Sequence, residues 1–440
     1  MTQTRVILIG GALATLVLAF IGQYAPSRDL LALWLAADAV ASGNPSQIFP
    51  PLGDTFAMRP PPGWYERAAE LDQLGEVYPY IYPPIWAWLM APLTKIMSFE
   101  TFRAGAFALN AGLLCATSYL AARLAGVHPG SPSTLRNWML VALALILVSQ
   151  AGTIALRQGQ VQILVAFLSV LALERAQRHH PKTAGIAMGI AIALKLSPLL
   201  LALLWLVTGH WRAFLWAMVV GGALGLASLI VAGWPLHAHF LALLGAIDQT
   251  VLITTVTYAL DTLIGGWSLL GAPQMIPIVP PEMLTPELTA ALEEPSANWL
   301  VLPKPALYAM IARGAVLATL ILSAFLLRRA ASPEAAAAAW ATAMTGIAFF
   351  GPIGWAYYYI APFAFAPLFL NRFGIAGGIA LLGAIGLCYV NPVKQMLWST
   401  LGLSPMQSIG LATLLYLCLM VFTSLSPTSR KSDDDPDPIR

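Results

Sequence analysis

Asp29 is the ionisable side chain with the clearest chemical potential in this sequence. It follows an apolar stretch, residues 6–24, and precedes a predicted amphipathic helix from Leu30 to Ser42. An acid at this position could cap the helix, because acidic side chains favour helix N-termini. A carboxylate at the boundary between water and lipid could instead act as a general base that takes the proton of an acceptor hydroxyl. From the residue alone, both interpretations stand.

Two basic side chains could bind a phosphate group. Arg157 begins a polar turn, Arg157–Gln160, between two apolar stretches, and Lys195 lies three residues before Pro198. Arg offers a planar set of donors and Lys a compact charge, and both suit a phosphate. A plain interfacial turn is the alternative for the Arg157 segment. A lone Lys at the centre of a membrane helix costs roughly 2.5–3.5 kcal/mol on insertion, so we expect Lys195 at a membrane face.

Amide and aromatic side chains that could contact a sugar occur nearby. Gln160 could hydrogen-bond to a sugar. Tyr82 belongs to a Tyr- and Pro-rich segment, and Trp355 and Tyr357 follow the sequence Gly-Pro-Ile-Gly. Their rings could form a stacking platform, whereas the alternative is an aromatic belt at the membrane surface.

The composition excludes several classes of protein. Of the 440 residues, 58% are hydrophobic and only 10% are charged, and the mean hydropathy is +0.74. A soluble domain is about 25% charged, so a soluble enzyme, a disordered chain and a nucleic-acid binder are all excluded. Repeated apolar runs of about 20 residues indicate a polytopic, all-α membrane protein. The three cysteines, Cys115, Cys388 and Cys418, have no metal-site spacing.

The distribution of charge predicts the topology. Residues 25–81 and 233–305 together hold 13 of the 20 acids but only 4 of the 23 Lys and Arg residues. Long segments poor in Lys and Arg belong outside the cytoplasm, and basic residues cluster between the other apolar runs. Placing those clusters inside predicts about 12 transmembrane helices with both termini cytoplasmic. The predicted spans are 6–24, 102–123, 136–156, 160–177, 183–196, 197–210, 212–232, 306–328, 334–350, 355–371, 373–390 and 405–425.

Three segments need separate interpretation. Residues 183–209 carry basic groups at both ends, so we favour two short crossings that meet near Lys195–Pro198, since proline disfavours continued helix before it. Residues 82–97 contain three prolines and fit a helix in the outer interface better than a span, although a short crossing remains possible. The charged tail 429–440 reads as disordered and cytoplasmic. The domain prediction is one transmembrane domain, 1–428, with outer loops 25–101 and 233–305.

An ordered set of motifs resembles glycosyltransferase family 87, whose members have the GT-C fold and include polyprenol-phosphate-mannose-dependent mannosyltransferases. The resemblance covers most of residues 6–371. It implies a polyprenyl-phosphate sugar donor, Asp29 as catalytic residue in the first outer loop, and Lys195–Pro198 near the donor phosphate; it implies no metal ion or other cofactor. The motifs are Asp29, Gly43-Asn44-Pro45, Tyr82-Pro83-Pro84, Gly159-Gln160, Ala184-Gly185 and Leu194-Lys195-Leu196-Ser197-Pro198.

One motif departs from the family. Mannosyltransferase relatives carry a Trp-x-His-His motif where this chain has Trp355-Ala356-Tyr357-Tyr358, which puts the role of that histidine and the identity of the sugar in doubt. Tyr357 can hydrogen-bond but is no general base near neutral pH, because its ordinary pKa is about 10.

We therefore expect transfer of mannose or another hexose from a polyprenyl-phosphate donor to a hydroxyl of a glycolipid or glycan acceptor. The catalytic residue would be Asp29, donor phosphate binding would involve Lys195 and Arg157, and the remaining contacts would come from Gln160, Tyr82, Trp355 and Tyr357. We expect the protein in a bacterial inner (plasma) membrane, surrounded by lipids, with an extracytoplasmic active site. The alternatives are a multi-span transporter or flippase and a non-catalytic membrane partner; no internal repeat of the kind that transporters often show is apparent.

Overall fold

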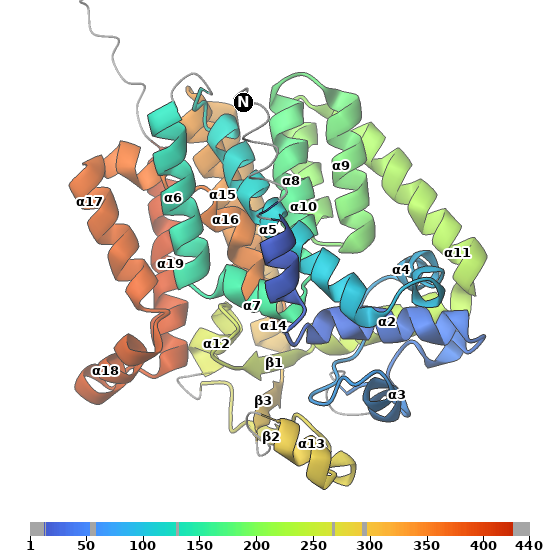
Figure 1. The fold of residues 1–440 in the computed structure, drawn as a ribbon. Helices are drawn as coiled ribbons and strands as arrows, with labels where there is room; N and C mark the ends of the chain where they lie inside the picture. The colour runs from blue at the N-terminus through green and yellow to red at the C-terminus, as the bar shows by residue number, and fades with distance from the viewer. Residues whose placement is uncertain are drawn as a thin grey trace, which may run out of the picture.

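The computed structural model describes residues 13, 15–52, 59–128, 132–265, 269–292 and 297–425, and within these ranges it is helical apart from three short strands (Figure 1). Five helices are long and apolar enough to cross a membrane, and a bent pair would make a sixth. Together with the composition, these helices identify an integral membrane protein. The five are α5 (Phe99–Leu124), α11 (Trp211–Asp248), α14 (Ala306–Arg329), α17 (Leu368–Leu387) and α19 (Pro405–Ser424).

Several predicted spans correspond to single helices. The spans 102–123, 306–328 and 405–425 match α5, α14 and α19, and 160–177 and 334–350 match α8 (Gln162–Gln177) and α15 (Pro333–Phe350). The predicted count of about twelve spans is not confirmed. The span 6–24 is described only from residue 13 on, and the tail 429–440 lies outside the described residues.

Two predicted spans were wrong as continuous helices. Residues 136–156 form α6 (Pro132–Val148) and α7 (Ala151–Gln158), which meet at an angle of 69° because Gln150 adopts a left-handed conformation with φ 65°. Residues 355–371 form only η4 (Ala356–Tyr359), α16 (Ile360–Phe363) and the start of α17. Pro362 and Pro367 limit helix continuity there, since each removes a backbone donor.

The predicted break before Pro198 is confirmed. Helix α9 (Pro181–Leu194) ends at Lys195, whose backbone is extended with φ −155° and ψ 131°, and α10 (Pro198–Val207) begins with the proline. Proline suits this first position because the first N–H groups of a helix have no partner within it. Lys195 therefore lies outside both helices.

The two charged segments that were predicted to be outer loops lie at one end of the helical bundle (Figure 1). The first contains α2 (Arg28–Ala41), η1 (Pro45–Gln47), α3 (Trp64–Glu70), α4 (Ile85–Met90) and η2 (Leu93–Lys95). Helix α2 confirms the predicted 30–42 helix. It packs against α5, where the Trp34 ring lies 5.8 Å from Phe99 and 5.3 Å from Phe102. Helix α4 has six residues, about 9 Å, which is too short to span a bilayer.

The second segment departs from the predicted loop in two ways. Helix α11 is broken at Gly233, whose φ of 76° and ψ of 162° are not helical, so the predicted span 212–232 ends at this break, but a further helical stretch continues to Asp248 inside the predicted loop. A three-stranded antiparallel sheet follows in the order β1-β3-β2. The strands of this sheet are β1 (Thr250–Ile253), β2 (Gln274–Pro277) and β3 (Asn298–Pro303). The same segment contains the helices α12 (Leu260–Gly265), η3 (Pro281–Met283) and α13 (Pro286–Ala291).

Outside this segment, helix α18 (Asn391–Leu401) was also not predicted.

Charge is separated between the two ends of the bundle. At the connection from α8 to α9, on the side away from α2 and the sheet (Figure 1), the fully buried Glu174 forms ion pairs with Arg123 at 3.1 Å, Arg175 at 2.6 Å and Arg178 at 2.5 Å. Three arginines around one carboxylate give this cluster a net positive charge, and the assignment of this end to the inner side of the membrane stays a prediction.

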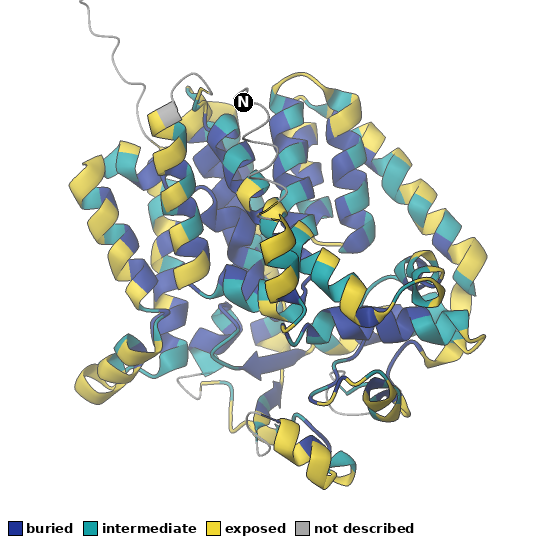
Figure 2. Cartoon of the chain, in the orientation of Figure 1, coloured by how far each residue is buried: buried dark blue, intermediate teal, exposed yellow. Residues whose placement is uncertain are grey.

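The interior of the bundle is formed by α8, α9, α15 and α16, which are mostly buried, whereas α11 and α17 expose many apolar side chains (Figure 2). Helix α9, which carries Lys195 at its end, packs closely on α11 through two glycines. A Cβ on Gly185 would lie 2.2 Å from Cβ of Trp216, and one on Gly189 would lie 2.7 Å from Cβ of Val220. Small residues at four-residue spacing let two membrane helices approach in this way.

Gly185→Leu should destabilise the protein because the new side chain has no room between α9 and α11. Overpacking typically costs about 1–3 kcal/mol. Gly225→Leu on α11 is the matched control, because nothing lies within 4 Å of a Cβ at that position. Thermal unfolding in detergent should give a lower midpoint for Gly185→Leu than for Gly225→Leu, and equal midpoints would contradict this account of the packing.

Candidate functional site

The start of α2 rests on the turn between α7 and α8. The backbone N–H of Ser27 donates to the carbonyl of Arg157 at 2.7 Å, and the N–H of Arg28 donates to Oε1 of Gln158 at 3.3 Å. Gly159 makes the approach possible: its φ is 65°, and a Cβ there would lie 2.7 Å from Cβ of Leu30. This contact places the first turn of α2 beside Gln160.

Asp29 lies in that first turn, and its carboxylate hydrogen-bonds to the side chain of Gln160. The Tyr82 hydroxyl donates to Oε1 of Gln160 at 3.3 Å, so the Gln160 amide N–H₂ is the group that donates to Asp29. Asp29 is not the N-cap of α2, because that position is occupied by Ser27. The hydrogen bond to Gln160 therefore goes beyond the capping role considered from the sequence.

Lys195 is far from Asp29 in sequence, but in space its charge acts on the Asp29 carboxyl. Its Nζ is 4.0 Å from the ring centroid of Tyr358 and 5.7 Å from that of Tyr357. The indole N–H of Trp86 donates to the carbonyl of Ala193 at 2.8 Å and so fixes the end of α9 against α4. A cation over aromatic faces keeps attractive contacts without a bound anion.

The electrostatics of Asp29 suit proton transfer near neutral pH. Burial raises the pKa of the Asp29 carboxyl to about 7, although the hydrogen bond from Gln160 and the charge of Lys195 both act to lower it. A base whose pKa lies near the working pH combines the correct protonation state with a useful driving force. Desolvation is the dominant cause.

One cavity of about 1060 Å³ joins these groups. The cavity extends from the protein interior to the surface, since its lining includes Gln160, which is 2% exposed, and Arg157, which is an exposed residue. All seven residues singled out in the sequence line the cavity, namely Asp29, Tyr82, Arg157, Gln160, Lys195, Trp355 and Tyr357. Arg28, Arg103, Gln162 and Lys304 also line the cavity and were not singled out, whereas the lining residues Tyr78 and Tyr358 belong to aromatic segments that the sequence had indicated. Gln162 lies two residues after the predicted Gln160, so proximity in sequence was the available signal for it.

Trp355 and Tyr357 are positioned by the chain that follows β1. The N–H of Tyr258 donates to the carbonyl of Gly354 at 2.7 Å, and the N–H of Ala356 donates to the carbonyl of Val256 at 2.9 Å. The rings of Trp355 and Tyr357 are stacked, with centroids 5.9 Å apart and an interplanar angle of 17°. Together they form a flat aromatic wall of the cavity.

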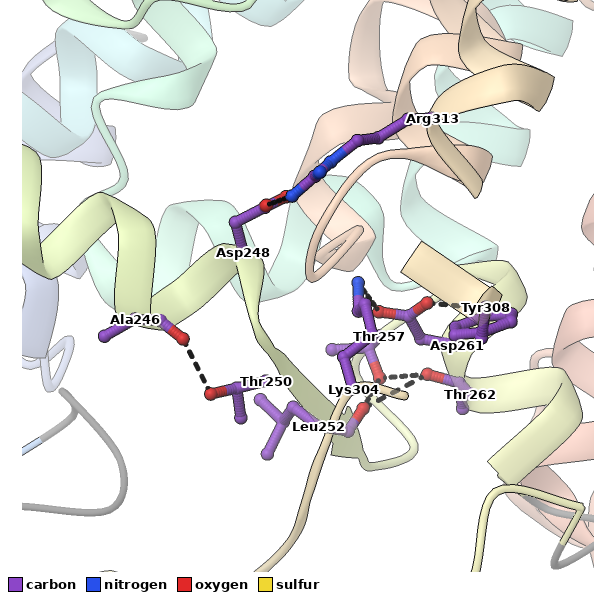
Figure 3. Close-up of polar contacts among 10 residues, drawn as sticks. All are labelled: Ala246, Asp248, Thr250, Leu252, Thr257, Asp261, Thr262, Lys304, Tyr308 and Arg313. Carbon is purple, nitrogen blue, oxygen red and sulfur yellow. Dashed lines mark hydrogen bonds and ion pairs between the residues drawn. The ribbon is translucent and has the colours of Figure 1, made fainter. Parts of the chain in front are cut away.

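Two ion pairs anchor the second outer segment beside the cavity (Figure 3). Lys304 and Asp261 meet at 2.8 Å, with each side chain only 3% exposed, and the Tyr308 hydroxyl donates to Asp261 at 2.6 Å. The pair therefore joins the end of β3 to α12 and α14. Asp248 and Arg313 form a more exposed pair between the end of α11 and α14. Lys304, Asp248 and Arg313 also line the cavity.

Gly159→Ala should destabilise the contact between α2 and the α7–α8 turn. The substitution adds both a left-handed alanine and a clash with Leu30, and strained φ/ψ values cost about 1–3 kcal/mol. Gly43→Ala is the control, since its φ is 81° and nothing lies within 4 Å of a Cβ. Thermal unfolding in detergent should rank wild type above Gly43→Ala and Gly43→Ala above Gly159→Ala. The interpretation fails if Gly159→Ala is the more stable of the two variants.

The comparison with protein families assigns the chain. A model of glycosyltransferase family 87 matches residues 80–350, more than half of the 440 residues. The matched range includes Tyr82, Arg157, Gln160 and Lys195, whereas Asp29 precedes it. No curated protein matches the chain. The chain belongs to glycosyltransferase family 87 and is a membrane-embedded glycosyltransferase.

Proposed function

We propose that this protein transfers a hexose from a polyprenyl-phosphate donor to a hydroxyl of a glycolipid or glycan on the extracytoplasmic side of a bacterial inner membrane. The observation that carries the proposal is the meeting of Asp29 and Lys195 in one cavity at the end of the apolar helices. The first offers a base for a hydroxyl and the second a cation for a phosphate. The extracytoplasmic side follows from the scarcity of Lys and Arg in the two outer segments.

The reaction exchanges one bond to the anomeric carbon for another. The acceptor oxygen forms a bond to that carbon while the bond from the carbon to the donor phosphate oxygen breaks. Asp29 takes the proton of the acceptor hydroxyl. Polyprenyl phosphate leaves with its electron pair, and the charges of Lys195 and Arg157 stabilise it. No cofactor enters this scheme.

The remaining cavity residues have roles that follow from their chemistry. Gln160 orients the Asp29 carboxylate, and Tyr82 orients Gln160. The stacked rings of Trp355 and Tyr357 offer an apolar face to the sugar ring. Tyr357 occupies the position where mannosyltransferase relatives carry a histidine, and in this scheme it donates a hydrogen bond and does not act as a base.

Asp29→Asn should abolish most of the activity, because asparagine keeps the size of the side chain but cannot take a proton. General bases typically contribute 10²–10⁴-fold to a rate, and we expect a loss of about that size. The matched control is Asp38→Asn on the same helix, where Asp38 pairs with Arg67 at 2.8 Å and does not line the cavity.

The measurement starts from a deletion strain whose lipids and glycans are compared with wild type by mass spectrometry. A product lacking one hexose identifies the acceptor, and purified protein is then assayed with that acceptor and polyprenyl-phosphate mannose or glucose. We expect the Asp38→Asn variant to restore the missing product in the deletion strain and to transfer the sugar in the purified assay. We expect the Asp29→Asn variant to do neither. Wild-type transfer by Asp29→Asn would refute the role of the acid, and transport of the donor without sugar transfer would favour the flippase alternative.

The rate should depend on pH through Asp29. Since the pKa of its carboxyl is raised to about 7, the base form predominates above pH 7 and is lost below it. We expect kcat/KM to fall with decreasing pH with a midpoint near 7, approaching tenfold per pH unit well below that midpoint. An unshifted Asp would place the midpoint near 4. Protein held at pH 5.5 and assayed again at pH 8 controls for denaturation, and a rate that is constant from pH 5 to 7 would contradict the assignment.

A further inference from the structure

Gln162 is a buried polar side chain of the cavity wall with an unused hydrogen-bond acceptor. It is the first residue of α8 and is 9% exposed. Its Oε1 is buried and has no hydrogen-bond partner among the described residues. Burying an amide oxygen without a donor is unfavourable, and buried polar groups in folded proteins are normally hydrogen-bonded. Other buried polar atoms of the described residues, such as the Ser323 hydroxyl, also lack a hydrogen-bond partner, but Gln162 lines the cavity, where a bound molecule can supply the donor.

The neighbouring glutamines make the contrast clear. Gln158, Gln160 and Gln162 alternate along the same short segment. Gln158 accepts from the N–H of Arg28, and Gln160 links Tyr82 to Asp29. Both side chains thus hold parts of the protein together. Gln162 lines the cavity without such a bond, and because its amide oxygen is itself buried, the side chain must turn toward the cavity to present that oxygen to a bound molecule.

The chemistry of the oxygen restricts the ligand. An amide oxygen accepts hydrogen bonds and does not donate them, so it cannot bind an ionised phosphate. It fits a hydroxyl group. The same face of α8 contributes Val165, Ala166 and Ser169 to the cavity, and these residues are buried within the helical bundle. A small ring that has both hydroxyl groups and apolar C–H faces suits this wall.

The position of Gln162 in the cavity suits a contact with the sugar of the donor better than a contact with the acceptor. Helix α8 begins inside the helical bundle, whereas α3, α13 and the sheet lie beyond the end of the bundle (Figure 1). An acceptor glycan is large and must be accommodated from the side of those outer segments. We propose that Gln162 accepts a hydrogen bond from one hydroxyl of the transferred sugar and thereby contributes to donor specificity. This inference rests on the proposed function and adds a specificity-determining residue to it.

The experiment measures donor binding, which does not require a known acceptor. Purified full-length protein is titrated with polyprenyl-phosphate mannose and glucose, with their monodeoxy forms, and with polyprenyl phosphate alone. Wild type should bind one monodeoxy sugar lipid about tenfold more weakly than the parent, since a site built for a hydroxyl rejects the analogue that lacks it. Gln162→Met should bind parent and analogue within twofold, at the weaker value, and should bind polyprenyl phosphate as wild type does.

A stability measurement separates this role from a structural one. Gln162→Met removes an unpartnered buried oxygen, so the melting temperature without ligand should stay the same or rise. The matched control is Gln407→Met on α19, because Gln407 is also buried but forms a capping box with Ser404. That variant should melt at a lower temperature and should retain the wild-type preference for the parent sugar.

Two outcomes overturn the inference. If Gln162→Met discriminates among the deoxy sugars as wild type does, or melts as low as Gln407→Met, then Gln162 does not recognise a sugar hydroxyl, and the proposed function is unaffected. If wild type binds none of the polyprenyl-phosphate hexoses, the proposed function itself fails, and the assignment of Gln162 fails with it.

Discussion

The close contact between α2 and the turn that joins α7 to α8 is the constraint on which the site depends. Without a side chain at Gly159, Leu30 can approach the turn, and the N–H of Ser27 can reach the carbonyl of Arg157. Asp29 is then held beside Gln160 rather than free in an outer loop. If Asp29 is the base that we propose, its position on a helix means that it needs no reordering when a substrate binds, which is how enzymes gain from preorganisation.

Burial shifts the pKa values of the two charged groups of the site in opposite directions, raising that of Asp29 and lowering that of Lys195. Desolvation disfavours a carboxylate and an ammonium alike, but each charge also stabilises the other. Without the charge of Lys195, the pKa of Asp29 would be higher still and the carboxyl more difficult to ionise. With the charge of Lys195 but without burial, the pKa would be lower and the carboxylate would be a weaker base. The bridging amide of Gln160 adds a donor to the same carboxylate. The arrangement keeps a usable base at neutral pH while leaving a cation near the position proposed for the donor phosphate.

Local signals explain why part of the molecule was predictable. The start of α2 and the break at Lys195 follow from proline, glycine and charge within a few residues, and the structure has both. The bend at Gln150 carries no such signal, because residues other than glycine rarely adopt a positive φ and nothing in the neighbouring sequence marks this glutamine as one that does. The sheet was missed because strands of four to six residues in a long loop show no clear alternation. All predicted site residues reached one cavity, yet Gln162 was overlooked because its lack of a partner is visible only in three dimensions.

Asp29 and Gln162 differ from the buried ion pairs elsewhere in the fold. Asp261 is paired with Lys304 within the protein, and Glu174 is paired with three arginines. Breaking such a pair would leave an uncompensated buried charge, so these groups serve the structure. Asp29 is partly buried, where desolvation disfavours its ionised form, and the oxygen of Gln162 is buried without a donor. Folding alone favours neither arrangement, and places where a chain departs from the rules of stability are where function is to be expected. Both departures occur along the same short path, from the first turn of α2 to the first turn of α8, and this path is where the proposed sugar would lie.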